Sequence, residues 1–246
     1  MIISINRFYP GVKSGGPQTS VYNFCKFVSN TYLIKPTVIT LDRDVLDKYP
    51  YNFLSKGRIL NYYEFGFSKV IYIHERFKFI YPFVLFFHLF RDRVLIVNSF
   101  FNPIFGLLIP RLLMFFLKIK VFCISRGELQ RNSLNIKYKK KNLFIRFFNL
   151  LNLKEIDFVF SDVNELKDSN LASKLNIIKH SILPNLPQYI DHEILYVKKA
   201  LPVFTLLYLG RIDEDKNLLF FLNSLKEIKR KIKVDIYGPI RNSVYW

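Results

Sequence analysis

Short β-branched runs alternate with longer amphipathic segments along the whole of this chain. Residues 1–6, 37–41 and 94–98 are rich in Ile, Val and Leu, which is typical of strands buried on both faces. Segments with helical spacing stand between such runs. This alternation is typical of βαβ units and predicts an α/β fold, in which helices cover both faces of a mostly parallel sheet.

The same patterns divide the chain into two parts. Further strands are expected at residues 69–73, 120–124, 157–161, 177–183, 203–209 and 233–237, and helices at 17–29, 76–90, 103–117, 134–153, 163–175 and 217–229. The rhythm breaks at residues 187–202, where Pro187 and Pro202 enclose scattered charges. We therefore expect a doubly wound, Rossmann-like N-terminal domain at 1–186, a connection at 187–202, and the beginning of a second such domain at 203–246.

Two apolar stretches resemble membrane spans but do not meet the requirements of one. Residues 77–90 are too short, and residues 100–117 carry Pro110 and Arg111. A span needs ~20 apolar residues with few or no charges. Both stretches are predicted to be helices packed on the sheet, and the Phe and Tyr residues in general follow core-like spacing.

The two cysteines, Cys25 and Cys123, lie in apolar runs without the spacing of metal ligands. Buried core thiols are therefore expected rather than a disulfide, and the four histidines show no metal pattern either, so no metal site is predicted. No signal-peptide pattern opens the chain. Together these features predict a cytoplasmic protein.

The chain is strongly basic, with 37 Lys and Arg against 19 Asp and Glu and a formal net charge of +18. Between residues 111 and 154 one acid, Glu128, faces eleven cations: Arg111, Lys118, Lys120, Arg126, Arg131, Lys137, Lys139, Lys140, Lys141, Arg146 and Lys154. Such a patch favours an anionic surface. The amphipathic helix at 134–153 therefore has two interpretations, peripheral docking on the inner face of the plasma membrane or a solvated helix without a partner. No nucleic-acid-reading motif accompanies the charge, so a nucleic-acid-binding protein is the weaker alternative.

Glycines follow the first strand. Gly15 and Gly16 stand directly before a predicted helix, where a backbone without side chains and the positive end of the helix dipole suit a phosphate group. A flexible strand-to-helix turn explains the same residues equally well.

Two further turns carry charge. In the stretch from Gly210 to Asn217, Arg211 and Lys216 are spaced to hold a diphosphate, unless they pair with the acids between them. After the strand at 120–124, Arg126 is a candidate for contacting a ligand phosphate, and Glu128 is either an acid or base or a residue that begins a helix.

Six stretches carry short motifs in a fixed order: Pro10 to Gly16, Ser125-Arg126-Gly127-Glu128-Leu129, Ser161 to Glu165, Pro184-Asn185, Gly210-Arg211 with Lys216, and Ile236-Tyr237-Gly238-Pro239. Together they resemble motifs of the retaining glycosyltransferases of family 4, which have the two-domain GT-B architecture. The second stretch is similar to S-P-R-G-M-L without its proline, and Leu186 stands where the family has a glycine after P-N.

This resemblance implies transfer of a hexose from a nucleotide sugar, such as a UDP- or GDP-sugar, with retention of configuration and without a further cofactor. It implies a glycan or lipid-linked acceptor, in polysaccharide biosynthesis. Gly15, Gly16, Arg211 and Lys216 would bind the donor phosphates. Asn185 and Gly238, besides Arg126 and Glu128, are possible ligand contacts.

The sequence also departs from the family. The E-x7-E motif, whose acids bind the donor, would lie beyond position 246, and no pair of acids at that spacing follows Gly238. The expectation is therefore a chain truncated in its second domain. The alternative to an active transferase is an inactive truncated N-terminal domain, which binds an acceptor or nothing.

Overall fold

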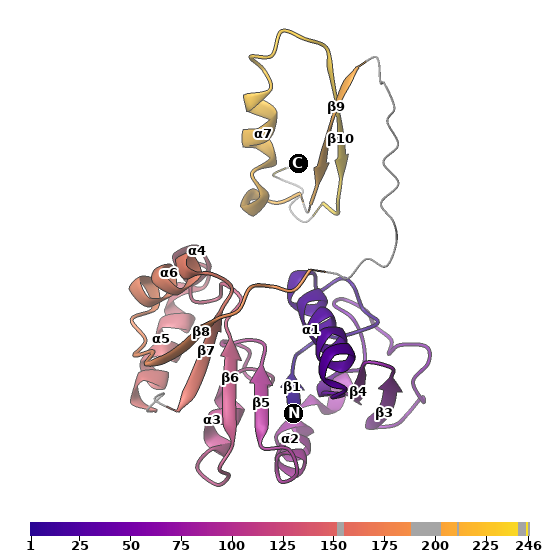
Figure 1. The fold of residues 1–246 in the computed structure, drawn as a ribbon, viewed down its shortest axis with the longest axis vertical. Helices are drawn as coiled ribbons and strands as arrows, with labels where there is room; N and C mark the ends of the chain where they lie inside the picture. The colour runs from indigo at the N-terminus through magenta and orange to yellow at the C-terminus, as the bar shows by residue number, and fades with distance from the viewer. Residues whose placement is uncertain (152–154, 188–202, 211, 241–244, 246) are drawn as a thin grey trace. The chain divides into compact units, whose positions relative to one another are not determined.

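The computed structural model describes residues 1–151, 155–187, 203–210, 212–240 and 245 (Figure 1). The chain forms two compact units, Met1–Ile190 and Asp191–Trp246. Each is described by itself below, as unit 1 and unit 2.

Unit 1 is built on an eight-stranded sheet with the order β3-β4-β2-β1-β5-β6-β7-β8. The strands are β1 Ile2–Ser4, β2 Thr37–Leu41, β3 Leu60–Phe65, β4 Ser68–Ile73, β5 Val94–Val97, β6 Lys120–Ile124, β7 Ile156–Phe160 and β8 Lys179–Ile182. All neighbours are parallel except β3 and β4. This confirms the predicted α/β class with a mostly parallel, Rossmann-like sheet. The strand order reverses at β1, so the topological switch point lies between β1 and β5.

Strand β3 is a finding that the sequence analysis missed. It pairs antiparallel with β4, and the register from Leu60↔Ile73 to Phe65↔Ser68 closes the pair across a two-residue turn. As an edge strand it carries exposed side chains, including Tyr62 and Tyr63. Such a strand lacks the continuous apolar run of a central parallel strand, which explains why the pattern gave no signal.

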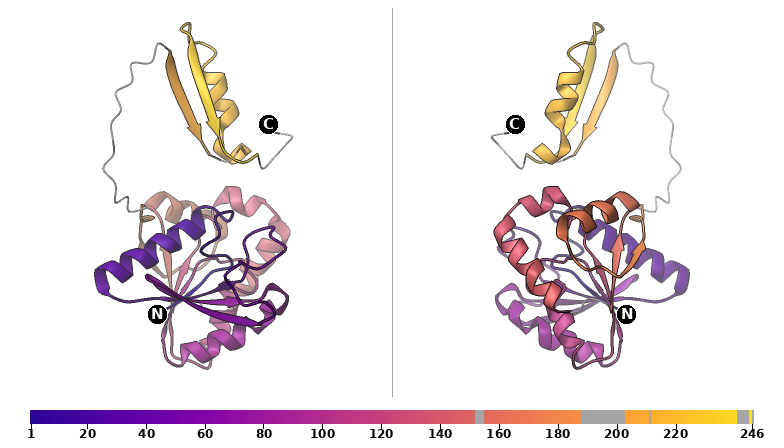
Figure 2. Two further views of the ribbon diagram at one scale, coloured as in Figure 1. Left: turned by 90° about the vertical axis from the view of Figure 1, so that its right-hand side faces the viewer. Right: turned by 90° about the vertical axis from the view of Figure 1, so that its left-hand side faces the viewer.

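Helices cover both faces of the sheet (Figure 2). Helix α1 (Gly16–Tyr32) packs on one face, while α2 (Tyr81–Leu89), α3 (Leu108–Leu113) and α5 (Tyr138–Leu150) lie on the other. Two separate cores result. Val21 and Cys25 of α1 pack with Ile3 and Ile96, whereas Leu85 of α2 and Phe148 of α5 belong to the core on the opposite face. The remaining helical segments of unit 1 are η1 (Glu75–Ile80), α4 (Arg131–Asn135) and α6 (Val163–Ser173).

Three predicted helices of unit 1 are interrupted or are only partly α-helical. The segment 134–153 is interrupted, because Lys137 takes a left-handed φ of 57° between α4 and α5. Within 103–117 only α3 is α-helical, since the Asn102 side chain accepts hydrogen bonds from the backbone of Ile104 and Phe105 and holds a turn there. The segment 76–90 begins as the 3-10 helix η1 before α2.

Among the described residues, no helix combines the length and the apolar character that crossing a membrane requires.

Unit 2 is a βαβ arrangement. Strands β9 (Phe204–Leu209) and β10 (Ile232–Tyr237) pair in parallel in a two-stranded sheet, and the 3-10 helix η2 (Glu214–Lys216) and helix α7 (Leu218–Ser224) stand between them in the chain. Both strands were predicted. The helix ends well before the predicted residue 229, and a turn with a hydrogen bond from Ile228 N to Leu225 O follows it.

Candidate functional site

A cavity of about 650 Å³ lies at the carboxyl ends of the unit 1 strands. In doubly wound sheets the ligand crevice lies at this edge, beside the switch point. The cavity is walled by α1, by the loops that follow β6 and β7, and by the segment after β8. Its polar lining comprises Thr19, Ser20, Asn23, Arg126, Gln130, Ser161, Asp162, Glu165 and Asn185, together with the backbone of Gly16 and Gly127.

Arg126 joins four segments of the chain at this cavity. Its Nε donates to Asn98 Oδ1 at 3.0 Å, and its Nη1 donates to Ser20 Oγ at 3.0 Å and also to Asn185 Oδ1. No carboxylate forms an ion pair with it within the described ranges. Burial lowers the pKa of Arg126, and the charge of Glu165 opposes that shift. The predicted contacts Arg126 and Asn185 thus meet in one place, and the guanidinium there has polar partners but no ion-paired carboxylate among the described residues.

Glu165 is a site residue that the sequence analysis named only within a motif. Its side chain is 4% exposed and receives four hydrogen bonds. The donors are Gly127 N (2.6 Å), Ser161 N (2.7 Å), Ser161 Oγ (2.7 Å) and Ser125 Oγ (3.2 Å). The carboxylate therefore ties the loop that carries Arg126 to the loop after β7. The available signal was the stretch from Ser161 to Glu165, an S-x-x-x-E spacing, because it places the acid in the first turn of α6.

The glycine loop, residues 10–16, is held by Asp44, which does not line the cavity. Gly15 has φ 74° and ψ −142°, and a side chain added at Gly15 or Gly16 would meet no atom within 4 Å. Gly16 lines the cavity and has open space beside its backbone, whereas Gly15 is not among the residues that line it. The carboxylate of Asp44, which the sequence analysis missed, accepts hydrogen bonds from Val12 N (2.6 Å) and Lys13 N (2.8 Å).

These bonds also affect the protonation of Asp44. Burial raises its pKa, but hydrogen bonds from the backbone of Lys13, Val45 and Val12 and from the Ser14 hydroxyl outweigh burial, so the pKa lies below its ordinary value. The carboxylate is therefore charged at neutral pH and fixes the shape of the loop.

Glu128 points away from the cavity. Its carboxylate receives hydrogen bonds from Ser99 Oγ (2.8 Å), Phe100 N (2.6 Å) and Phe101 N (3.1 Å). The backbone N–H groups of Phe100 and Phe101, in the loop after β5, thereby have a hydrogen-bond acceptor. The geometry gives Glu128 a structural role in that loop, and it does not line the cavity.

Two candidate positions of unit 2, Gly210 and Gly238, follow the carboxyl ends of β9 and β10. Gly210 N donates to Tyr237 O at 3.0 Å, and Ile212 N donates to Pro239 O at 3.0 Å, so the two loops run side by side around Gly238. Lys216 ends η2, and its side chain is exposed. Arg211 lies outside the described residues.

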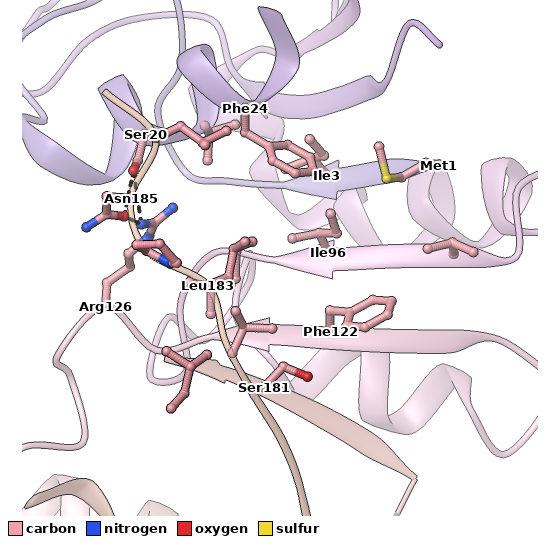
Figure 3. A pocket seen from close by; sticks show the side chains of 17 residues that line it. Met1, Ile3, Ser20, Phe24, Ile96, Phe122, Arg126, Ser181, Leu183 and Asn185 are labelled. Carbon is pink, nitrogen blue, oxygen red and sulfur yellow. Dashed lines mark hydrogen bonds between the residues drawn. The ribbon is translucent and has the colours of Figure 1, made fainter. Parts of the chain in front are cut away.

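An apolar groove of about 390 Å³ continues from the cavity along the α1 face of the sheet. It passes over Ile3, Ile96 and Phe122 of three neighbouring strands and beneath Phe24 of α1 (Figure 3). Ser20, Arg126 and Asn185 line both spaces, and in Figure 3 they meet at one end of the groove.

No family model matches the chain, and no curated protein matches it in sequence. In the part of the chain that is described, no group of three or more His, Cys, Asp or Glu side chains could hold a metal ion. The fold and the cavity define a Rossmann-like α/β protein with an arginine-bearing cavity at the switch-point edge of its sheet.

Proposed function

We propose that this chain is a GT-B glycosyltransferase of the cytoplasm, which moves a sugar from a nucleotide sugar to a glycan or lipid-linked acceptor with retention of configuration. The observation that carries the proposal is Arg126. It is a partly buried guanidinium with no carboxylate partner among the described residues, in a cavity of about 650 Å³ at the edge where doubly wound folds bind ligands. A cation in that position favours an anionic ligand, and a nucleotide sugar carries a diphosphate.

The chemistry requires cations near the leaving group. When the bond between the sugar and the diphosphate breaks, negative charge grows on the phosphate oxygens, and fixed donors stabilise it without rearrangement. We assign Gly15 and Gly16 of unit 1 and Arg211 and Lys216 of unit 2 to the donor phosphates. The open approach at Gly16 and the exposure of Lys216 support this assignment. Arg126, Asn185 and Gly238 are the further ligand contacts that we propose.

The first test is nucleotide binding by the whole chain. Arg126→Gln, Lys216→Ala and Arg211→Ala should each weaken UDP or GDP binding about tenfold or more in calorimetry, since each removes a charge-assisted hydrogen bond. The matched control is Arg58→Gln, which alters an exposed arginine on a different part of unit 1. If the three variants bind as tightly as the control, the assignment is wrong.

The second test is transfer itself. Radiolabelled UDP- and GDP-sugars are incubated with the protein and a lipid or glycan extract, and the anomeric configuration of the product is read by NMR. We expect label in the acceptor fraction with the configuration of the donor. Nucleotide binding without transfer to any acceptor would contradict the enzymatic part of the proposal and leave a binding protein.

A further inference from the structure

A row of exposed phenylalanines runs along η1 and α2. Phe79, Phe83 and Phe87 are 72%, 68% and 70% exposed, and Phe90 follows at 57%. Their spacing of four, four and three residues places them on one side of the helical segment. The segment was predicted to pack on the sheet, and α2 does so through Tyr81, Val84, Leu85 and Leu89. The phenylalanine row on its other side is left in solvent.

A second exposed cluster lies beside it. Phe115 and Phe116 follow α3 and are 63% and 80% exposed. Val94 and Lys120 are register partners in β5 and β6, and Lys120 N donates to Arg93 O at 2.8 Å. The turn that leads from α2 to Val94 and the turn that leads from α3 to Lys120 therefore run side by side at the amino ends of β5 and β6. Figure 1 shows α2 and α3 at this end of the sheet. We call Phe83, Phe87, Phe90, Phe115 and Phe116 the phenylalanine surface.

The segments that carry this surface are basic. Between residues 76 and 120 there is one acid, Asp92, and there are seven Lys or Arg: Arg76, Lys78, Arg91, Arg93, Arg111, Lys118 and Lys120. Of these, Arg111 is buried and Lys120 lies 3.9 Å from a carboxylate oxygen of Asp157. Asp92 accepts a hydrogen bond from the N-terminal ammonium at 2.9 Å. Arg91, Arg93 and Lys118 are exposed. Large apolar patches are uncommon on monomeric soluble proteins and mark interaction sites, and the charge around this one selects an anionic partner.

Helix α5 also carries exposed apolar and basic side chains. Leu143, Phe147 and Leu150 are exposed on its outer side, whereas Ile145 and Phe148 are buried. Lys139 and Lys140 are exposed near its beginning. The end of α5 contacts α3 directly, because Arg111 Nε donates to Leu151 O at 3.0 Å. The aromatic and basic character therefore continues from α2 through α3 to α5 on one face of the sheet (Figure 2).

We infer that the phenylalanine surface docks on an anionic lipid bilayer. Several exposed phenylalanines with lysines and arginines around them match a bilayer interface, where rings enter the acyl boundary and cations meet the lipid phosphates. A bilayer is also broad enough to cover α2, α3 and α5 at once. None of the residues of the phenylalanine surface lines the cavity at the carboxyl ends of the strands, so docking does not occupy that cavity. The inference is independent of the sugar transfer proposed above.

The experiment is sedimentation of the whole chain with phosphatidylglycerol vesicles and with neutral phosphatidylcholine vesicles. The wild type should bind the anionic vesicles and be released by high salt. Phe87→Ser/Phe116→Ser should lower the partition coefficient about tenfold or more, since two rings no longer leave water. The matched control is Leu33→Gln/Leu46→Gln, which alters two residues 89% and 94% exposed outside the surface and should bind as the wild type does.

A second variant does not depend on a loss of binding. Phe116→Trp places a fluorophore at an exposed position, and its added fluorescence relative to the wild type should shift to the blue and be quenched by brominated lipid. Absence of quenching, equal binding to neutral and anionic vesicles, or unchanged binding of the double phenylalanine variant would each overturn the inference. It would also be overturned if the double variant changed only the oligomeric state, because the surface would then meet a second copy of the chain.

Discussion

Replacing Glu165 tests whether one buried carboxylate organises the candidate site. In Glu165→Ala, the backbone N–H groups of Gly127 and Ser161 lose acceptors at 2.6 and 2.7 Å. A buried donor left without a partner costs about 1–3 kcal/mol, and hydrogen bonds to charged groups lie at the upper end of the scale. Both donors line the cavity, where water can reach them in part. We therefore expect the free energy of unfolding to fall by about 2–4 kcal/mol.

The assay is urea unfolding of the whole chain followed by far-UV circular dichroism. Glu165→Gln keeps one acceptor oxygen and should lose less stability than the alanine variant. Glu64→Ala is the control, because Glu64 forms an exposed ion pair with Lys35 at 2.9 Å, and such pairs contribute little. If Glu165→Ala unfolds at the same urea concentration as Glu64→Ala, the carboxylate does not hold the two loops together.

Three further predictions concern the glycine loop and the thiols. Gly15→Ala should cost about 1–3 kcal/mol in urea unfolding, because φ 74° with ψ −142° suits only glycine, whereas Gly16→Ala should cost almost nothing; equal losses would contradict the backbone argument. The pKa of Asp44 in the folded protein lies below its ordinary 3.8. The carboxylate therefore stabilises the folded state fully above that pH, and this stabilisation is lost as the pH falls through the folded pKa. Asp44→Asn should therefore flatten the acid limb of a stability–pH profile, and an unchanged limb would argue against it. Cys25 and Cys123 should resist thiol reagents until urea unfolds the chain, because burial raises the pKa of Cys25 to about 12 and that of Cys123 as well; rapid labelling of the native protein would refute this.

The fold class could be predicted because strand and helix periodicities are local. Runs such as 37–41 and 120–124 are apolar on both faces, and that pattern requires a sheet covered on both sides. Edge strand β3 gave no such signal, since one edge and its outer side chains meet solvent. The kink at Lys137 was equally hidden, because a single left-handed residue does not disturb the spacing of apolar side chains.

Parts of the candidate site also followed from the sequence. Gly16, Arg126 and Asn185 were named from motifs that follow predicted strands, and the structure brings them to one cavity. The roles of Asp44 and Glu165 did not follow. Each acts on a loop that is about 30 residues or more away in the chain, and those loops become neighbours through the order of strands in the sheet.

By itself, then, the sequence determined the parallel strands and the helical segments between them, where cations and glycines follow them, and that the chain is strongly basic. Only the tertiary structure decided that the carboxylate of Glu128 serves the loop after β5, that Arg126 has no carboxylate partner among the described residues, and that Phe83 and Phe87 face solvent. The physical reason is that periodicity reports how a segment alternates between apolar and polar sides. It does not report which side another element covers, and that depends on the strand order.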